Sequence, residues 1–434
     1  MTIPITSPPP KPTVASVLKN YNFRLLWIGQ GISLLGDYFF MIALPWLILK
    51  ITNDPLALGI ILALIGIPRA VIMLVGGAVS DRIPPRLIMI VSDVLRLGLT
   101  ALLAAMILTS TLQLWMLYLI ALVFGIISGF FMPASGAMMP LLVKPEELTL
   151  SNSIYSGTAQ LSAFIGPVLA GGLIGIFAPS NSPNASADLT GIALALAFDA
   201  FTFLASVVTL ALMRWESISR PVDKAAASIL QSVREGLVYM WHEDLLRTMF
   251  IVMVASNFLF SGPLVVGMPV IANTRLSGAA SFGLIVGGYG IGNLLGIVLS
   301  NPLAQVLYKR MGTYMVSVFV VFGIGLGLMG LTSSTIFAFV ILLVMGVCNG
   351  ILAITLITSL QRKTPKDMLG RVMSLVMLAS VGLQPISQAL TGVVIKLSLT
   401  WLFYGAGILM ALVAVWLAFQ PVMHHIEEAL AIGS

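Results

Sequence analysis

Five ionisable residues lie inside long apolar segments of this chain: Asp37, Arg69, Asp93, Arg96 and Asp199. If these segments cross a bilayer, each charged side chain costs at least ~2.5–3.5 kcal/mol there, so each is a functional candidate that needs a partner. Asp37 and Arg69 each lie about twelve residues from the same end of adjacent segments, or ~18 Å at 1.5 Å per residue. Their equal depth predicts that the two side chains meet.

Such a pair can bind and release a proton, because burial favours the neutral acid whereas a neighbouring arginine favours the carboxylate. The sequence therefore indicates Asp37 as a proton-coupling residue and Arg69 as its switchable partner, with a static ion pair as the alternative. Asp199 is a second proton-site candidate, unless it is a protonated acid bonded to a neighbouring helix. Asp93 and Arg96, spaced i and i+3, can pair within one helix, and we expect a structural role near the cytoplasmic end.

The composition indicates which elements must position these residues. Of the 434 residues, 59% are hydrophobic and 9% are charged, against roughly 25% charged in soluble domains. A water-soluble globule is therefore excluded. The basic residues are spread over short loops, so we expect no nucleic-acid partner. The single cysteine, Cys348, excludes an intrachain disulfide.

Apolar windows of about 20 residues are long enough to cross a bilayer. They predict an all-α membrane protein with twelve spans, near 25–49, 56–79, 87–109, 113–138, 150–177, 189–213, 247–273, 280–307, 313–332, 335–360, 368–396 and 399–421. The longest connection separates two sets of six. The expected organisation is a disordered tail 1–20, a first bundle 21–213, a linker 214–246, a second bundle 247–421 and a tail 422–434.

The basic residues predict the orientation, since they concentrate in cytoplasmic loops. With the N-terminus inside, seventeen of the 22 Lys and Arg residues are cytoplasmic and two lie within spans. Only Lys50, Arg275 and Lys396 fall outside. We therefore expect a multi-pass protein of the cell membrane (plasma or inner membrane) with both termini in the cytoplasm.

The two halves repeat each other in the same order. Pro145 and Pro365 are 220 residues apart, and each opens a helix that has acidic residues in its first turn. Pro45 and Pro269 occupy similar places in spans 1 and 7. Between the halves, residues 228–241 have apolar side chains at helical spacing, which predicts an amphipathic helix on the cytoplasmic surface or a simple linker helix.

The loop between spans 2 and 3, residues 76–86, contains glycines, an Asp-Arg pair and a further Arg. It resembles the loop 2–3 signature of the major facilitator superfamily, although Pro84 and Pro85 replace the usual glycine and basic residue. The resemblance implies twelve helices in two pseudo-repeats that rock about a midplane site. It also implies a conformational latch at the start of span 11, for which the candidates are Gly77, Asp81, Arg82, Arg86, Asp93, Arg96 and Arg371.

Span 5 resembles the signature of antiporters in that superfamily, through Ser162, Gly166, Pro167 and Gly171. Generic packing of small residues is the alternative. The segments 27–30, 35–37, 43–46, 198–200 and 234–237 resemble the macrolide-efflux and siderophore-exporter branch. The resemblance extends from about residue 16 to residue 421. It implies export rather than uptake.

Polar side chains on apolar spans are candidates for the substrate path, although many such residues only join helices. They are Gln30, Tyr38, Gln160, Asn257, Asn293, Asn349, Gln384 and Gln388. We expect proton-coupled efflux of a hydrophobic or amphipathic small molecule (drug, siderophore or metabolite) by a monomer in the lipid bilayer, with no cofactor or metal. Uptake symport, uniport and lipid handling remain alternatives. No nucleophile–base pair appears, so an enzyme is not expected.

Overall fold

The computed structural model describes residues 13–80, 83–177, 185–214, 229–303, 310–365 and 368–421. The regular structure in these ranges is helical. Twelve helical segments of this part are long and apolar enough to cross a membrane. The predictions of an all-α membrane protein and of twelve spans are therefore confirmed.

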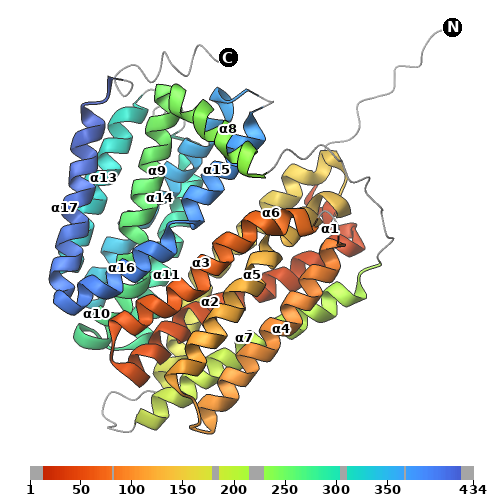
Figure 1. The fold of residues 1–434 in the computed structure, drawn as a ribbon, viewed down its shortest axis with the longest axis vertical. Helices are drawn as coiled ribbons and strands as arrows, with labels where there is room; N and C mark the ends of the chain where they lie inside the picture. The colour runs from red at the N-terminus through yellow and green to blue at the C-terminus, as the bar shows by residue number, and fades with distance from the viewer. Residues whose placement is uncertain are drawn as a thin grey trace.

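Six long helices after a short α1 form the first group in the chain, and they pack against one another (Figure 1). The bilayer core has no water to bond backbone N–H and C=O groups, so a helix, which pairs these groups within itself, is the form that can cross it. The elements are α1 (Val14–Lys19), α2 (Tyr21–Thr52), α3 (Pro55–Ser80), α4 (Pro85–Leu108), α5 (Leu114–Leu142), η1 (Pro145–Glu147), α6 (Leu148–Ile176) and α7 (Ala185–Leu212).

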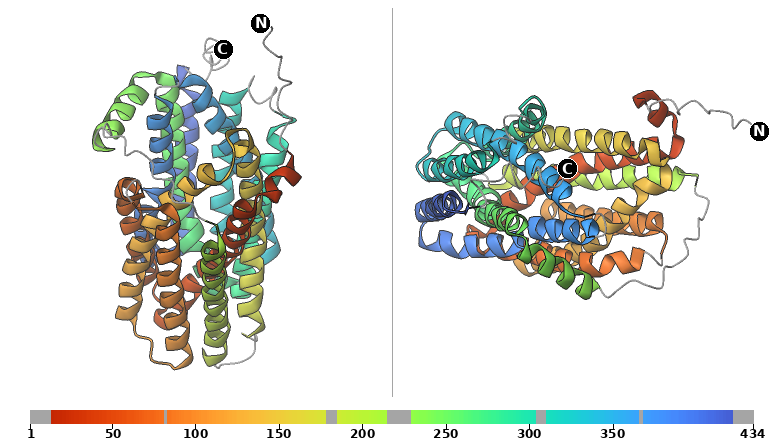
Figure 2. Two further views of the ribbon diagram at one scale, coloured as in Figure 1. Left: turned by 90° about the vertical axis from the view of Figure 1, so that its right-hand side faces the viewer. Right: turned by 90° about the horizontal axis from the view of Figure 1, so that it is seen from above.

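The remaining helices form a second group beside the first, and in the left-hand view of Figure 2 the helices of both groups run along the long axis. The elements are α8 (Ile229–His242), α9 (Asp244–Gly262), η2 (Pro263–Gly267), α10 (Met268–Arg275), α11 (Ala279–Ser300), α13 (Met311–Met329), α14 (Thr335–Lys363), α15 (Leu369–Val381), α16 (Gln384–Leu397) and α17 (Leu399–Ala418). We call the end where α2 begins and α17 finishes the terminal end, and the opposite one the far end.

Spans 7 and 11 are each interrupted along their length. Span 7 joins α9 to α10 through η2, one π-helical turn that opens at Pro263. Span 11 changes from α15 to α16 just before Pro385. Proline lacks the N–H that continues a helix ladder, which explains both interruptions.

Part of the predicted disordered tail 1–20 is ordered, which corrects that prediction. Thr13 and Ser16 exchange side-chain and backbone hydrogen bonds in a capping box, and α1 follows. Val17 is fully buried in a cluster with Phe23, Met139 and Val143. The helix forms because this apolar side chain finds a site on the first bundle. Residues 1–12 and the predicted tail 422–434 lie outside the described residues.

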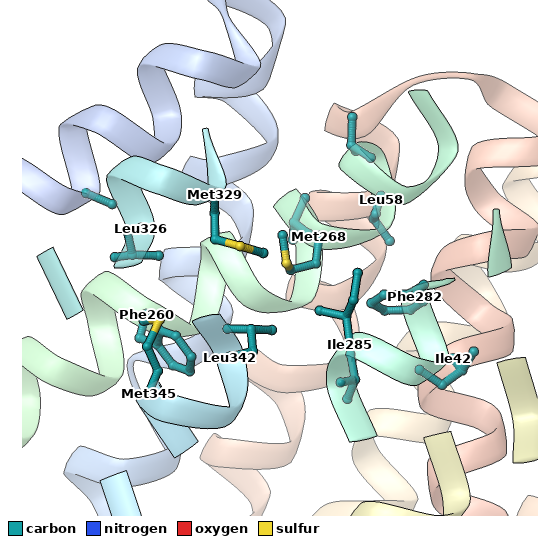
Figure 3. Packing of buried hydrophobic residues seen from close by; sticks show 14 of the residues in the cluster. Ile42, Leu58, Phe260, Met268, Phe282, Ile285, Leu326, Met329, Leu342 and Met345 are labelled. Carbon is teal, nitrogen blue, oxygen red and sulfur yellow. The ribbon is translucent and has the colours of Figure 1, made fainter. Parts of the chain in front are cut away.

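Among the described side chains, the largest apolar core joins the two bundles at the far end. Within the first bundle its buried members fall in 39–49, 57–61, 103–107, 117–121, 170–174 and 192–196, the far half of each helix. Figure 3 shows Ile42 and Leu58 of the first bundle beside Phe282, Ile285 and Met268 of the second. Near the terminal end the first bundle has separate clusters of its own.

Glycines let the backbones of the two bundles approach at this end. A Cβ added to Gly59 on α3 would lie 2.8 Å from the carbonyl oxygen of Gln388 and 3.1 Å from the Cα of Gly392 on α16. A Cβ on Gly171 of α6 would lie 2.8 Å from the Cα of Gly283 on α11. Asp54 and Lys396 add an ion pair of 3.4 Å across the same end. We call the α3–α16 and α6–α11 contacts the glycine seams.

The predicted linker helix is present as α8, although the side chains of 229–234 are not described. Gly236 lies against Arg371 and Leu375 of α15, and Glu235 forms an ion pair of 3.1 Å with Arg371. Met240 is fully buried, whereas Val238 and Trp241 are exposed. Helix α8 is thus attached to the second bundle and presents an apolar outer face.

Alanine substitutions at the adjacent glycines Gly171 and Gly172 of α6 test whether the glycine seams are tightly packed. We expect Gly171→Ala to lower the free energy of unfolding by about 1–3 kcal/mol, because the new methyl meets backbone atoms that cannot move aside. A Cβ on Gly172 would meet nothing within 4 Å, so Gly172→Ala should be neutral or stabilise the helix by roughly 0.5–1 kcal/mol. Thermal unfolding of the two purified variants measures the difference. Equal melting temperatures would rule out a tight seam.

Candidate functional site

Polar side chains from three helices meet in the middle of the first bundle. Asp37 lies midway along α2, and its side chain is 43% accessible. Helix α2 packs against α3, α5, α6 and α7 of its own bundle and against α10 and α11 of the other. Because helices surround α2 in this way, the accessible carboxylate faces the interior of the molecule rather than the lipid.

Arg96 of α4 lies between two carboxylates. Its Nη2 is 2.7 Å from Oδ1 of Asp93, and its Nη1 is 4.0 Å from Oδ1 of Asp37. The guanidinium carbon lies 3.8 Å from the ring centroid of Phe131 and 4.8 Å from that of Phe203. Only 4% of Arg96 is exposed. The planar fork and its stacking on aromatic rings suit arginine, and lysine could not reproduce both contacts.

Ser206 of α7 holds Asp93 from the other side. Its hydroxyl donates to Oδ2 of Asp93 at 2.6 Å and accepts from Nε2 of Gln30 at 3.0 Å. Gln30 was a substrate-path candidate, but it is 3% exposed and points into this cluster instead. The five side chains form the Arg96 network: Gln30, Asp37, Asp93, Arg96 and Ser206.

Sequence reasoning missed Ser206, although a helical pattern could have indicated it. On α7 the polar residues Asp199, Thr202, Ser206 and Thr209 follow the i, i+3, i+7, i+10 spacing of one helix face. That face meets the glycines of α2, since a Cβ on Gly36 would collide with Thr202 and one on Gly29 with Thr209. A polar stripe opposite a glycine stripe marks the interface that holds the network.

Asp199 belongs to this interface and not to the network. It is fully buried, and among the described residues neither of its carboxylate oxygens has a hydrogen-bond partner. Its Oδ1 lies 2.7 Å from the position that a Cβ on Gly36 would take. The carboxyl group is therefore next to the residue that precedes Asp37 in α2, but it is closed off from the space that Asp37 faces.

Among the described residues the ion pair of Asp37 is with Arg96 and not with the predicted partner Arg69, whose charge nevertheless acts on Asp37. Among the described residues Arg69 makes no ion pair, and its Nε is buried without a hydrogen bond. Arg96 is eleven residues from Pro85, the start of α4, or about 16 Å at 1.5 Å per residue. Both arginines are thus at the depth of Asp37, and it is the side of each helix that decides which one reaches it.

The predicted latch stays a prediction, because its central residues are not in the described part of the chain. Asp81 and Arg82 lie outside the described residues, and Gly77 is a residue of α3. Arg86 donates to the carbonyl oxygens of Leu210 and Ala211 at the end of α7. Asp93 and Arg96 belong to the Arg96 network, which corrects their assignment to a cytoplasmic cluster. Arg371 pairs with Glu235 of α8.

The antiporter-like residues of span 5 lie where α6 meets α2 and the second bundle. Gly166 faces Tyr38 of α2. Gly171 and the carbonyl oxygen of Pro167 face Gly283 of α11. Ser162 is buried on the same helix. These residues place α6 between α2, which carries Asp37, and the second bundle.

The other substrate-path candidates come from α2, α6, α9, α11, α14 and α16. Asn257 donates to the carbonyl oxygen of Met253 in its own helix. Gln384, the first residue of α16, donates to the carbonyl oxygen of Ser380 in α15, and Gln388 donates to Ser261 at 3.4 Å. Asn293 keeps a buried amide oxygen without a partner among the described residues. The partly exposed members of the set are Tyr38, Gln160, Asn257, Asn293, Asn349, Gln384 and Gln388.

In the described ranges no three His, Cys, Asp or Glu side chains are arranged to hold a metal ion. The arrangement can instead bind a proton. The accessible carboxylate of Asp37 lies beside the guanidinium of Arg96, which is already paired with Asp93. In the second bundle the described charged side chains lie near the helix ends, such as Arg275, Arg371 and Lys396. The intramembrane charge is thus confined to the first bundle.

Comparison with known proteins agrees with this architecture. A family model described as "Major Facilitator Superfamily" matches residues 26–383. Macrolide efflux protein A of Streptococcus pyogenes is 24% identical over 376 residues, which is 82% of this chain and 86% of that protein. Enterobactin exporter EntS of Escherichia coli O139:H28 is 25% identical over 379 residues, 87% of this chain and 86% of the exporter.

Among solved structures, a POT family transporter in complex with a thioalcohol-conjugated peptide superposes with a TM-score of 0.71. The superposition covers 92% of this chain and 96% of the other, at 14% sequence identity. At that identity the likeness shows the fold alone.

Two arginine variants test which guanidinium serves the aspartates. Arg96→Met should lower the free energy of unfolding by about 3–5 kcal/mol, because it leaves a buried carboxylate without its partner. Arg69→Met should cost markedly less, since Arg69 makes no ion pair among the described residues. Thermal unfolding in detergent compares the two. Equal losses would return Arg69 to the role predicted from depth.

Proposed function

The chain belongs to the Major Facilitator Superfamily of transporters, and on that premise we propose that it exports an amphipathic or hydrophobic small molecule in exchange for protons. The observation that supports coupling most directly is Asp37, an accessible carboxylate in the middle of an apolar helix. Membership of the family makes the chain a multi-pass membrane protein that moves small molecules and is not an enzyme.

We place the terminal end in the cytoplasm, because most Lys and Arg residues lie on that side and basic loops stay inside. The apolar core and the glycine seams then close the extracellular end. In this proposal the structure represents an inward-facing form. The opposite form would part the seams and bring the terminal ends of the bundles together, as in alternating access about a midplane site.

Protonation of Asp37 provides the switch in this scheme. Two unit charges 4 Å apart attract by about 4 kcal/mol at an effective dielectric constant near 20, and a proton on Asp37 removes that attraction. Turning a two-state equilibrium from 1:99 to 99:1 takes about 5.5 kcal/mol. The proton shifts the populations by the part of this attraction that differs between the two forms, for which about 4 kcal/mol is the upper bound, while Asp93 keeps Arg96 in place.

Export, rather than uptake, is supported by the relatives and by α6. The relatives are named for macrolide efflux and enterobactin export, and the Gly166–Pro167 region resembles the span 5 signature of antiporters. The 23 Met and 21 Phe residues of the chain suit adaptable apolar contacts. A macrolide or a siderophore is therefore the substrate class to try first.

Everted membrane vesicles with an acidic interior test the proposal. With erythromycin and enterobactin as probes, vesicles containing the protein should accumulate at least one of them, and a protonophore should abolish the accumulation. Asp37→Asn should reduce it to the level of vesicles without the protein, because the amide cannot exchange a proton. Asp244→Asn is the matched control, since Asp244 forms an exposed pair with Arg247 away from the network.

The same assay separates the alternatives. Accumulation that a protonophore leaves unchanged would indicate another coupling ion, and equilibration of the substrate without accumulation would indicate a uniporter. Substrate movement out of acid-loaded vesicles would indicate a proton symporter. Wild-type accumulation by Asp37→Asn would remove Asp37 from the coupling step.

A further inference from the structure

We infer that Asp199 is a second proton-binding site, which exchanges a proton with Asp37 around Gly36 during transport. The inference rests on the proposed proton coupling and adds a second proton-binding aspartate, which differs from the first in its accessibility. Asp37 is accessible from the interior of the molecule, whereas Asp199 is closed off behind α2.

The geometry begins with the missing partners of Asp199. A buried carboxyl group normally has hydrogen-bond donors, yet neither oxygen of Asp199 has one among the described residues. Thr202, one turn along α7, donates its hydroxyl to the backbone oxygen of Asp199 and not to its side chain. A buried carboxylate without donors or a cation is strongly disfavoured. The site therefore requires a small cation, at least part of the time.

The identity of that cation follows from the neighbours. The charged groups that act on Asp199 are Asp37 from α2 and Arg96 and Asp93 from α4. From α6, which also packs on α7, no described charged group acts on it. Arg96 is already engaged by Asp93 at 2.7 Å, and no described set of acids is arranged for a metal ion. A proton is the cation that remains.

The route is set by accessibility. Asp93 and Asp199 are both fully buried, and Asp37 is the member of the three whose side chain is accessible. Asp199 lies close to the backbone of Gly36, the residue before Asp37, since a Cβ on Gly36 would lie 2.7 Å from Oδ1 of Asp199. Gly36 has no side chain that could separate the two acids. A proton entering this side of the bundle therefore meets Asp37 first and Asp199 second.

Asp37 and Asp199 share no hydrogen bond in this form, so the transfer takes place when the Asp37 side chain leaves Arg96 and reaches the Asp199 carboxylate, and it then balances without a further reactant. The protonated carboxyl of Asp37 gives its proton to the carboxylate of Asp199, so Asp37 becomes a carboxylate and Asp199 a neutral acid. Asp37 can then return to Arg96 while the proton remains inside the protein. The second site thus lets the Asp37–Arg96 pair re-form before the proton leaves.

Infrared difference spectroscopy of the reconstituted full-length protein tests this without a substrate. Steps of pH should change two carbonyl bands of buried carboxylic acids in the wild type, and one of them should be absent in Asp199→Asn. Thr202→Val is the matched control, since it keeps the acid and the shape of the side chain and should keep both bands. Sodium ions added at constant pH should change neither band.

If Asp199→Asn has the same pH-difference spectrum as the wild type, Asp199 is a fixed structural acid and the inference is overturned. Should that variant fail to fold, wild-type protein labelled with ¹³C in its aspartate carboxyls gives the count, and a single buried aspartate that changes with pH would also overturn it. The vesicle assay is separate: wild-type protein without proton-driven accumulation would refute the proposed function and leave the infrared result standing.

Discussion

A single buried guanidinium serves two carboxylates in the first bundle, and the rest of the site depends on this unequal sharing. Asp93 holds Arg96 at 2.7 Å and is itself held by Ser206, so this half of the arrangement stays intact when the other half changes. Asp37 is at 4.0 Å and accessible, so its contact can be broken without unpairing Arg96. Such a pair is suited to switching, because its loss leaves no buried charge uncompensated.

The glycine seams supply the second constraint. They join the bundles through backbone contacts at the far end, where a side chain as small as alanine does not fit at Gly171. The apolar core continues across the same end and breaks into separate clusters near the terminal end. The described intramembrane charges lie in the first bundle, so movement of one bundle against the other need not carry any of them through an apolar contact.

Much of the fold follows from the sequence, because bilayer thickness and hydropathy determine how many helices cross and where they end. Depth could also be counted, and it placed Asp37 and Arg69 at similar levels, whereas Arg96 was expected nearer the cytoplasmic end. The direction in which each side chain points around its helix axis could not be counted in this way. The sequence therefore predicted Arg69 as the partner of Asp37, whereas the packing of α2, α4 and α7 makes Arg96 the partner. The role of Ser206 depends on the same packing. The resemblance to the loop 2–3 signature indicated candidate latch residues but not their contacts. Among them, Arg371 pairs with Glu235 of α8.

In the proposed cycle a proton on Asp37 changes the relative position of the bundles. Spin labels at Ser153 on α6 and Gln361 on α14, two exposed positions near the terminal end, would measure this as a distance distribution, after Cys348→Ser removes the single native cysteine. The account predicts that the distribution shifts between high and low pH, and that Asp37→Asn shows the low-pH distribution at both. A pH-dependent shift that persists unchanged in Asp37→Asn would contradict it.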